Sequence, residues 1–281
     1  MTESPYERGS RLARLSGLAL LWLILIVILY PFLEMISTAL KSQPELSHYP
    51  PVWFPPDPHF GNFIEVWRQI PLATYLRNSV IIAGGSTILN GVVAIPAGYA
   101  LARFQFPGRQ TFLHMVVATQ MFSPVVLLLA TFRMMFSFGL LNTYWSVIFI
   151  NATTTLPFTI WMLAAYFSTI PKEIEEAAIL DNAGRWRMLI DHFVPIAMPG
   201  IITAMTFAFV IAWNEFLFAV TFITDQNLRP LTTGIYTFVG RTETLWQFLM
   251  AASLVSIVPV FIGFLFVQRR LVSGLAAGAV K

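Results

Sequence analysis

Cysteine is absent from the 281 residues of this chain, so neither disulfide bonds nor thiolate metal sites can contribute to its structure or chemistry. Charged residues are also scarce. They make up 11% of the sequence, whereas a water-facing surface of this size needs roughly 25–35% of Asp, Glu, Lys and Arg. Because 57% of the residues are hydrophobic, the composition excludes an ordinary soluble domain and indicates that lipid surrounds most of the chain.

Lysine is nearly absent as well, since only Lys41, Lys172 and Lys281 are present and none of them follows a glycine. A Gly-x-x-x-x-Gly-Lys-Ser/Thr phosphate loop is therefore missing, and the chain cannot hydrolyse ATP itself. No Gly-x-Ser-x-Gly stretch supports a nucleophile triad. The four histidines show no ligand spacing, and the net charge of +3 is too small to indicate nucleic acid. We expect no catalytic residue, no metal and no cofactor in this chain.

Long apolar runs are what the sequence has in abundance. A bilayer core about 30 Å thick needs roughly 20 mainly apolar helical residues. Six runs of suitable length cover residues 15–33, 79–102, 112–131, 146–167, 200–223 and 249–267. They predict an all-α integral membrane protein with six transmembrane helices that form one domain, residues 1–281.

Two local features are expected to shape these spans. Ala94, Gly98 and Ala102 recur every four residues in the second run and form a small-residue face that permits close helix approach. Pro96 lies on the same run, and Pro124 and Pro259 lie in the third and sixth runs. Proline removes a helix hydrogen bond, so each is expected to kink its helix.

Basic residues set the predicted orientation. The amino-terminal segment, residues 103–111, residues 168–199 and the tail 268–281 together hold eleven of the 17 Lys and Arg. The positive-inside rule places these segments, and hence both termini, in the cytoplasm. The first run resembles a signal peptide, but it is longer than an h-region and no small-x-small cleavage site closes it, so we expect a retained helix.

The longest predicted cytoplasmic stretch, residues 168–199, parses into two short helices. Glu173, Glu175 and Glu176 follow Pro171 near the positive amino end of the first helix, where the helix dipole favours anions. Asn182 fits the left-handed position that ends a helix.

The second helix carries an apolar pattern, Trp186, Leu189, Ile190 and Phe193, before Pro195 and Pro199 end it. Such a helix-turn-helix suits insertion into a groove on another protein, or it lies on the lipid headgroups. The residues alone leave both interpretations open.

This stretch resembles the EAA loop of ABC importer permeases, whose pattern is E-A-A-x-x-D-G-A followed by an aromatic residue and two prolines. The matching residues are Glu176, Ala177, Ala178, Asp181, Ala183, Trp186, Pro195 and Pro199. Asn182 stands where the family usually has glycine, a change that the turn geometry tolerates. The resemblance implies that the following residues couple the chain to an ATPase: Glu175, Glu176, Ala177, Ala178, Asp181, Asn182, Ala183 and Trp186.

Two more stretches resemble the carbohydrate-uptake, maltose-type branch of that family. They are Trp213-Asn-Glu-Phe-Leu-Phe-Ala219 and the closing Gln268-Arg-Arg-Leu-Val-Ser-Gly-Leu-Ala-Ala-Gly-Ala-Val-Lys281, and Leu76-Arg-Asn-Ser-Val80 adds to the similarity. The first implies a substrate pathway near Trp213, Asn214, Glu215 and Phe216. The second implies that the tail, with Ser273, Gly274 and Gly278, reaches the ATPase.

The resemblance implies a type I importer of the bacterial cytoplasmic (inner) membrane. Its other parts are a homologous second permease, two copies of an ABC ATPase that binds ATP and Mg, and an extracytoplasmic solute-binding protein. The implied substrate is a sugar or a related polyol, moved by alternating access.

Glu215 is the one carboxylate well within a predicted span, so it is a candidate for function. Its functional role would be a hydrogen bond to substrate hydroxyls or to the gate, and its structural role a polar contact with a neighbouring helix, together with Asn214. The structural role is favoured because polar packing residues are common in bundles. Trp213 and Phe216 also have two alternatives. They could stack on a sugar ring, or they could pack against other helices, and packing is favoured because the chain has many aromatic residues. An ion-driven carrier would need more buried ionisable groups, and a purely structural subunit leaves the docking loop unexplained.

Overall fold

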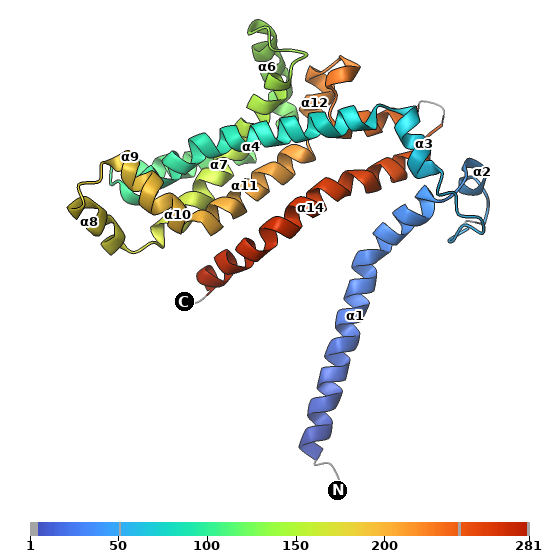
Figure 1. Ribbon diagram of the computed structural model, residues 1–281, viewed down its shortest axis with the longest axis horizontal. Helices are drawn as coiled ribbons and strands as arrows, with labels where there is room; N and C mark the ends of the chain where they lie inside the picture. Colours follow the sequence, from blue (N-terminus) through green and yellow to red (C-terminus); the bar gives the residue numbers. More distant parts are fainter. Residues whose placement is uncertain (1–4, 51, 241–242, 280–281) are drawn as a thin grey trace. The chain divides into compact units, whose positions relative to one another are not determined.

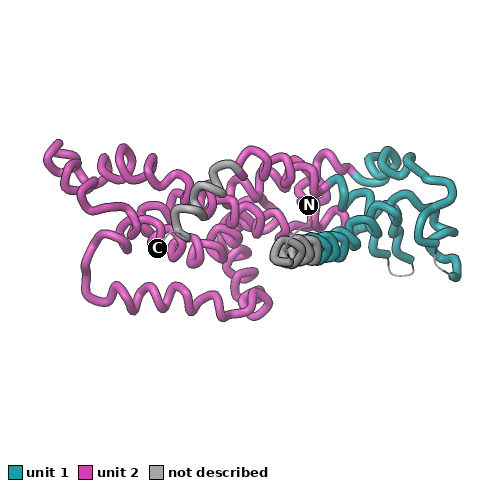
Figure 2. The backbone as a smooth tube through the Cα atoms, turned by 90° about the horizontal axis from the view of Figure 1, so that it is seen from below, with its two compact units in different colours: residues 1–70, 237–255 teal, residues 71–236, 256–281 magenta. Residues whose placement is uncertain are grey.

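A computed structural model of the chain describes residues 5–50, 52–240 and 243–279, with side chains described from residue 17 to residue 268 within those ranges. The chain divides into two compact units (Figure 2). One comprises residues 1–70 and 237–255, and the other comprises residues 71–236 and 256–281.

The secondary structure of the described residues is helical, apart from a single bridge between Val239 and Thr244. The first unit contains α1 (Pro5–Ala39), α2 (Gln43–Leu46) and α3 (Asn62–Gln69). The second contains α4 (Leu72–Arg103), α5 (Arg109–Ala118), α6 (Pro124–Ser137), α7 (Tyr144–Ser168), α8 (Lys172–Leu180), α9 (Arg185–Arg187), α10 (Val194–Ile196), α11 (Met198–Trp213), α12 (Leu217–Phe222) and α13 (Leu231–Ile235). Helix α14 (Trp246–Ala279) has residues in both units.

Four described stretches are long and apolar enough to cross a membrane: Gly17–Ala39, Leu72–Arg103, Tyr144–Ser168 and Trp246–Gln268. They correspond to the first, second, fourth and sixth predicted spans. The count rises to six if each of two bent helix pairs is one span. The first pair, Arg109–Met121 with Pro124–Ser137, bends by 97°, and the second, Arg185–Ile196 with Met198–Trp213, bends by 84°.

The predicted third span, residues 112–131, is therefore not one continuous helix. Phe122 and Ser123 have extended backbone, and Pro124 is the first residue of α6. The proline ring disfavours helical backbone in the residue before it. At the first position of a helix the missing N–H of proline costs nothing, because the N–H groups of the first turn have no partner within the helix. Pro124 thus begins a helix after a break, whereas Pro96 and Pro259 lie inside continuous helices.

Helices α4, α7 and α11 pack together and form the body of the second unit, with α8, α9 and α10 gathered at one end (Figure 1). The predicted small-residue face lies in this packing. Ala94 and Gly98 are buried on α4. A Cβ atom on Gly98 would lie 2.8 Å from Cβ of Leu163 and 3.2 Å from the backbone nitrogen of Ala164 on α7. Glycine is required here because the two backbones approach so closely.

A buried asparagine joins α4 to the segment that follows α12. The amide nitrogen of Asn78 donates to the carbonyl oxygens of Asn227 (2.8 Å) and Arg229 (2.9 Å), and its oxygen accepts from the Tyr144 hydroxyl (2.7 Å). Next to it, Ser79 Oγ accepts the Leu231 N–H at 2.8 Å. These bonds satisfy buried polar groups that would otherwise cost about 1–3 kcal/mol each. The Asn-Ser pair therefore fixes the beginning of α4.

The first unit is held by contacts at the end of α1. Lys41 is buried and lies 3.8 Å from the carboxylate of Glu34. Asn62 donates to the carbonyl oxygens of Ala39 (2.9 Å) and Lys41 (3.0 Å), which ties α3 to the same point. The apolar side chains of α1 from Leu18 to Leu33 are exposed. Such a surface suits contact with lipid or another apolar helix.

We predict that Gly98→Ala lowers the stability of the purified chain by about 1–3 kcal/mol, because its Cβ atom overpacks the contact with α7. Gly84→Ala is the matched control on the same helix, since a Cβ atom there meets nothing within 4 Å. It is expected to be neutral or to stabilise by up to about 1 kcal/mol. Denaturation in detergent measures both, and equal stabilities would contradict the close approach.

Candidate coupling site

Helix α8 ends in the left-handed turn that the sequence predicts. Asn182 has a φ of 55°. The N–H of Ala183 donates to the carbonyl oxygen of Ala178 at 3.0 Å, and the N–H of Asn182 donates to that of Ile179 at 2.9 Å. This pair of bonds is the Schellman arrangement, which satisfies the last carbonyls of a helix. The direction in which the chain leaves α8 is thus set by backbone hydrogen bonds.

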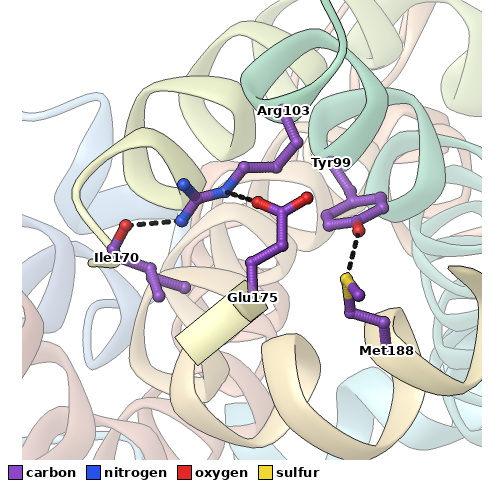
Figure 3. Close-up of polar contacts among 5 residues, drawn as sticks. All are labelled: Tyr99, Arg103, Ile170, Glu175 and Met188. Carbon is purple, nitrogen blue, oxygen red and sulfur yellow. Dashed lines mark hydrogen bonds and ion pairs between the residues drawn. The ribbon is translucent and has the colours of Figure 1, made fainter. Parts of the chain in front are cut away.

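One side of α8 faces the protein itself. Ala178 is buried in a cluster with Leu163 and Phe167 of α7, and Ala183 packs against the same cluster. Glu175 is half-buried, and its carboxylate lies 3.9 Å from Nε of Arg103 at the end of α4 (Figure 3). We call Glu175, Ala178 and Ala183 the inner face of the loop. These three predicted coupling residues contact the body of this chain.

The other side of α8 faces solvent. Of the predicted coupling residues, Glu176, Ala177, Asp181, Asn182 and Trp186 are exposed. Two residues outside the predicted set join them: Ile179 is exposed, and Leu180 is 87% exposed. We call these seven residues the outer face. The sequence pattern contained a signal for the last two, because apolar residues that directly follow the Ala-Ala pair cannot all point inward on one helix.

The predicted apolar face of the second helix is divided in the same way. Leu189 and Phe193 are buried, together with Met188, whereas Trp186 and Ile190 are exposed. Residues Met188–Phe193 form a π-helix instead of continuing α9. Single π-turns of this kind occur frequently at functional sites. Trp186, 67% exposed, adds a large apolar side chain to the outer face.

The predicted fifth span, residues 200–223, is interrupted in the Trp-Asn-Glu-Phe motif. Helix α11 ends at Trp213 and α12 begins at Leu217. The Glu215 carboxylate lies in this break and accepts the N–H groups of Phe218 (2.6 Å) and Ala219 (3.0 Å). A carboxylate at the amino end of a helix satisfies N–H groups that lack a helical partner. These contacts are those of a structural capping residue.

The four predicted pathway residues point in different directions. Trp213 is buried and stacks on Phe209, and Asn214 is exposed with its amide bonded back to the Val210 carbonyl. Glu215 and Phe216 line a cavity of about 500 Å³. The remaining lining residues are Gln120, Pro124, Val125, Asn151, Thr154, Thr155, Phe158, Phe207, Ile211, Leu217 and Phe218. The break in α11–α12 and the break before Pro124 thus meet at one cavity.

The cavity has a sparse polar lining. Asn151 is buried, and its side-chain nitrogen has no hydrogen-bond partner. Gln120 donates to the Thr154 carbonyl at 2.9 Å. This bond holds the end of the segment Arg109–Met121, just before the break at Pro124, against α7. Aromatic rings of Phe158 and Phe207, 4.3 Å apart between centroids, cover another part of the wall. The sequence did not predict a role for Asn151 or Phe158, because the residue pattern of one helix does not show which faces of different helices meet.

The predicted contacts of the tail involve side chains outside the described residues. Ser273, Gly274 and Gly278 belong to α14, but the side chains from residue 269 onward lie outside the described residues. Within the described residues, no group of three or more His, Cys, Asp or Glu side chains gathers at a point where a metal could bind.

A bundle of apolar helices with a structured loop at one end is the architecture of a polytopic membrane protein. Residues 94–276 match the family described as "Binding-protein-dependent transport system inner membrane component". The chain belongs to this family, the permease subunits of ABC importers in the inner membrane. It is a transport component and not an enzyme.

Several relatives are similar over nearly the full length. The sulfoquinovosyl glycerol transport system permease protein SmoH of Agrobacterium fabrum is 37% identical, over 90% of this chain and 89% of that protein. The probable ABC transporter permease protein YurM of Bacillus subtilis is 36% identical, over 93% and 86%. The trehalose/maltose transport system permease protein MalG of Thermococcus litoralis is 35% identical, over 92% and 94%.

A solved structure has the same fold. A crystal structure of a bacterial ABC transporter involved in the import of the acidic polysaccharide alginate contains a chain that matches with a TM-score of 0.78. The match covers 96% of this chain and 99% of that chain, with 21% sequence identity. The all-helical permease fold predicted from the sequence is therefore confirmed.

The turn after α8 can be tested on its own. Asn182→Val forces a β-branched residue into left-handed backbone, which costs about 1–2 kcal/mol, whereas Asn182→Gly fits the same φ freely. Hydrogen exchange of the α8 amides is expected to speed up in the Val variant and to stay at the parental rate in the Gly variant. Equal exchange in the two variants would show that the turn does not hold α8.

Proposed function

We propose that this permease subunit imports a sugar or a related polyol, and that the outer face of α8 docks on the ATPase subunit. The observation that carries the docking is the division of the loop into two faces. The inner face packs on the chain's own body, and the outer face presents Leu180 and Trp186, large apolar groups, to solvent. Burial of such groups by a partner stabilises a complex, at about 25 cal/mol for each Å² of apolar surface.

The charge of the outer face favours a protein partner over lipid headgroups. Glu176 and Asp181 are exposed beside the apolar residues. The cytoplasmic leaflet carries a negative surface potential, which repels carboxylates. A groove with basic residues at its rim would accept both the acidic and the apolar side chains.

The proposed assembly follows the family. It contains a homologous second permease, two copies of an ABC ATPase that bind ATP and Mg, and an extracytoplasmic solute-binding protein, with both termini of this chain in the cytoplasm. The tail around Ser273, Gly274 and Gly278 is proposed as a second contact with the ATPase. ATP-driven closure of the ATPase pair would move the docked loops as rigid bodies and switch the permease between its two orientations.

The sugar assignment rests on the relatives. SmoH is named for sulfoquinovosyl glycerol and MalG for trehalose and maltose. We propose that the cavity between the two helix breaks belongs to the substrate pathway, with Glu215 and Phe216 in its wall. Aromatic rings such as those of Phe158 and Phe207 in the cavity wall suit the CH faces of a sugar. Trp213, which is buried, and Asn214, which is exposed, lie outside the lining of this cavity.

Docking is tested by the recovery of the ATPase. We expect Leu180→Asp or Glu176→Lys to reduce the ATPase that co-purifies with this subunit at least tenfold, while membrane insertion stays intact. The first variant places a charge where an apolar group would be buried, and the second reverses a charge at the proposed interface. Quantitative mass spectrometry of the affinity-purified complex in mild detergent measures this.

The control is Gln105→Lys, an exposed residue on the loop between α4 and α5, which is expected to recover the parental amount of ATPase. Parental recovery with both α8 variants would contradict docking by the outer face.

The pathway is tested by filling the cavity. Thr154→Trp places a large ring in it and is expected to reduce uptake at least tenfold in proteoliposomes that contain the whole complex. Thr153→Trp, on the neighbouring exposed position of α7, is the matched control and is expected to keep uptake within twofold. The transported probe is whichever of maltose, trehalose and sulfoquinovosyl glycerol raises the melting temperature of the partner binding protein. Unchanged uptake with Thr154→Trp would remove this cavity from the pathway.

A further inference from the structure

Arg103 is the last residue of α4 and has no role in the family pattern from which the loop was recognised. Its side chain is only 5% exposed. A cation at this position is favoured by the negative end of the helix dipole. A guanidinium group this deeply buried, however, requires specific partners, because an unpaired buried charge is costly.

The partners of Arg103 come from three separate segments of residues 168–199, the coupling loop. Nη2 donates to the carbonyl oxygen of Ile170, just before α8, at 2.5 Å. Nε faces the Glu175 carboxylate in α8 at 3.9 Å (Figure 3). The guanidinium carbon lies 4.8 Å from the ring centre of Phe193, which follows the turn. One side chain of α4 therefore contacts the loop before α8, within α8 and after it.

The surroundings of this contact are apolar and closely packed. Tyr99, one turn before Arg103 on α4, donates its hydroxyl to the sulfur of Met188 at 3.1 Å (Figure 3). Its ring lies 4.9 Å from that of Phe193 and 6.2 Å from that of Phe167. Such packing excludes water, so the attraction between the charges of Arg103 and Glu175 is screened less than at the surface.

The Arg103–Glu175 distance is longer than a closed charge-assisted hydrogen bond, which measures about 2.7–2.9 Å. The Nε–H group is buried and has no hydrogen-bond partner. The pair is thus close enough to attract and still has about 1 Å through which it can close. A displacement of α8 toward or away from α4 would therefore change the distance between Arg103 and Glu175.

We propose that Arg103 is a positioning residue that transmits movement of α8 to α4 through its contact with Glu175. The proposal rests on the proposed docking of α8 on the ATPase. Glu175 and Glu176 then have distinct tasks although they are neighbours: Glu176 lies on the outer face, and Glu175 lies on the inner face, against Arg103.

The guanidinium group suits this task better than an ammonium group. A planar fork can donate to a carbonyl with one nitrogen, face a carboxylate with another and lie over an aromatic ring. The single ammonium of lysine cannot make these three contacts together. Arg103→Lys therefore keeps the charge and loses the geometry.

The experiment uses the absence of cysteine from this chain. A single fluorophore is attached to Val92→Cys, an exposed position on α4, in the complex assembled with cysteine-free partners. Trapping with ATP and vanadate is expected to shift the emission of the parental complex. Arg103→Lys and Glu175→Gln are expected to reduce that shift at least fivefold while the co-purified ATPase stays at the parental amount.

A purely structural role is distinguished by an apolar replacement. The double variant Arg103→Met with Glu175→Met fills the space without a charge, and such replacements often preserve or increase stability. Parental melting temperature with a lost emission shift supports transmission through the pair. A parental shift in this variant overturns the proposal, and if the double variant is not recovered, the result with Glu175→Gln decides.

Failure of the docking proposal is separable. If Leu180→Asp keeps both the ATPase and the full shift, α8 does not dock and the proposed function of the loop fails. If Leu180→Asp loses the ATPase but Glu175→Gln keeps the full shift, docking stands and the role of Arg103 is overturned.

Discussion

The constraint on which this structure depends is that lipid offers no hydrogen bonds to a polypeptide backbone. Apolar segments must therefore be helical, and every break in a helix must be satisfied within the protein. The chain meets this demand at its two interrupted segments in different ways. Pro124 begins α6 at a position where no helix donor is needed, and Glu215 supplies the acceptor for the first N–H groups of α12. Both breaks open onto the same cavity.

Features set by neighbouring residues were predictable, and features set by distant ones were not. The left-handed Asn182 and the close approach at Gly98 follow from local chemistry, and both are confirmed. The break at Ser123–Pro124 was missed because hydropathy remains high through it. Arg103 was missed because its partners lie more than 60 residues away in the chain, so that only the packing of α4 against the loop brings them together.

The coupling loop shows why a motif identifies a site better than it assigns the task of each residue. Glu175, Glu176, Ala177 and Ala178 form one short stretch of sequence, but a helix turns successive residues by about 100° and places them on different sides. Ala178 is buried while Ala177 is exposed. One sequence pattern therefore contains two kinds of residue: those that hold the loop on the helices and those that are exposed.

The separation of these two sides has a consequence for how such subunits diversify. If the outer face docks on the ATPase as proposed, substitutions there would change which ATPase is accepted while the inner face continues to hold the loop on the bundle, since the two sets share no side chain. The choice of ATPase and the attachment of the loop to the helices would then evolve independently. A permease duplicated within one genome could acquire a new ATPase by altering a few exposed residues of α8, without rebuilding the helices beneath it.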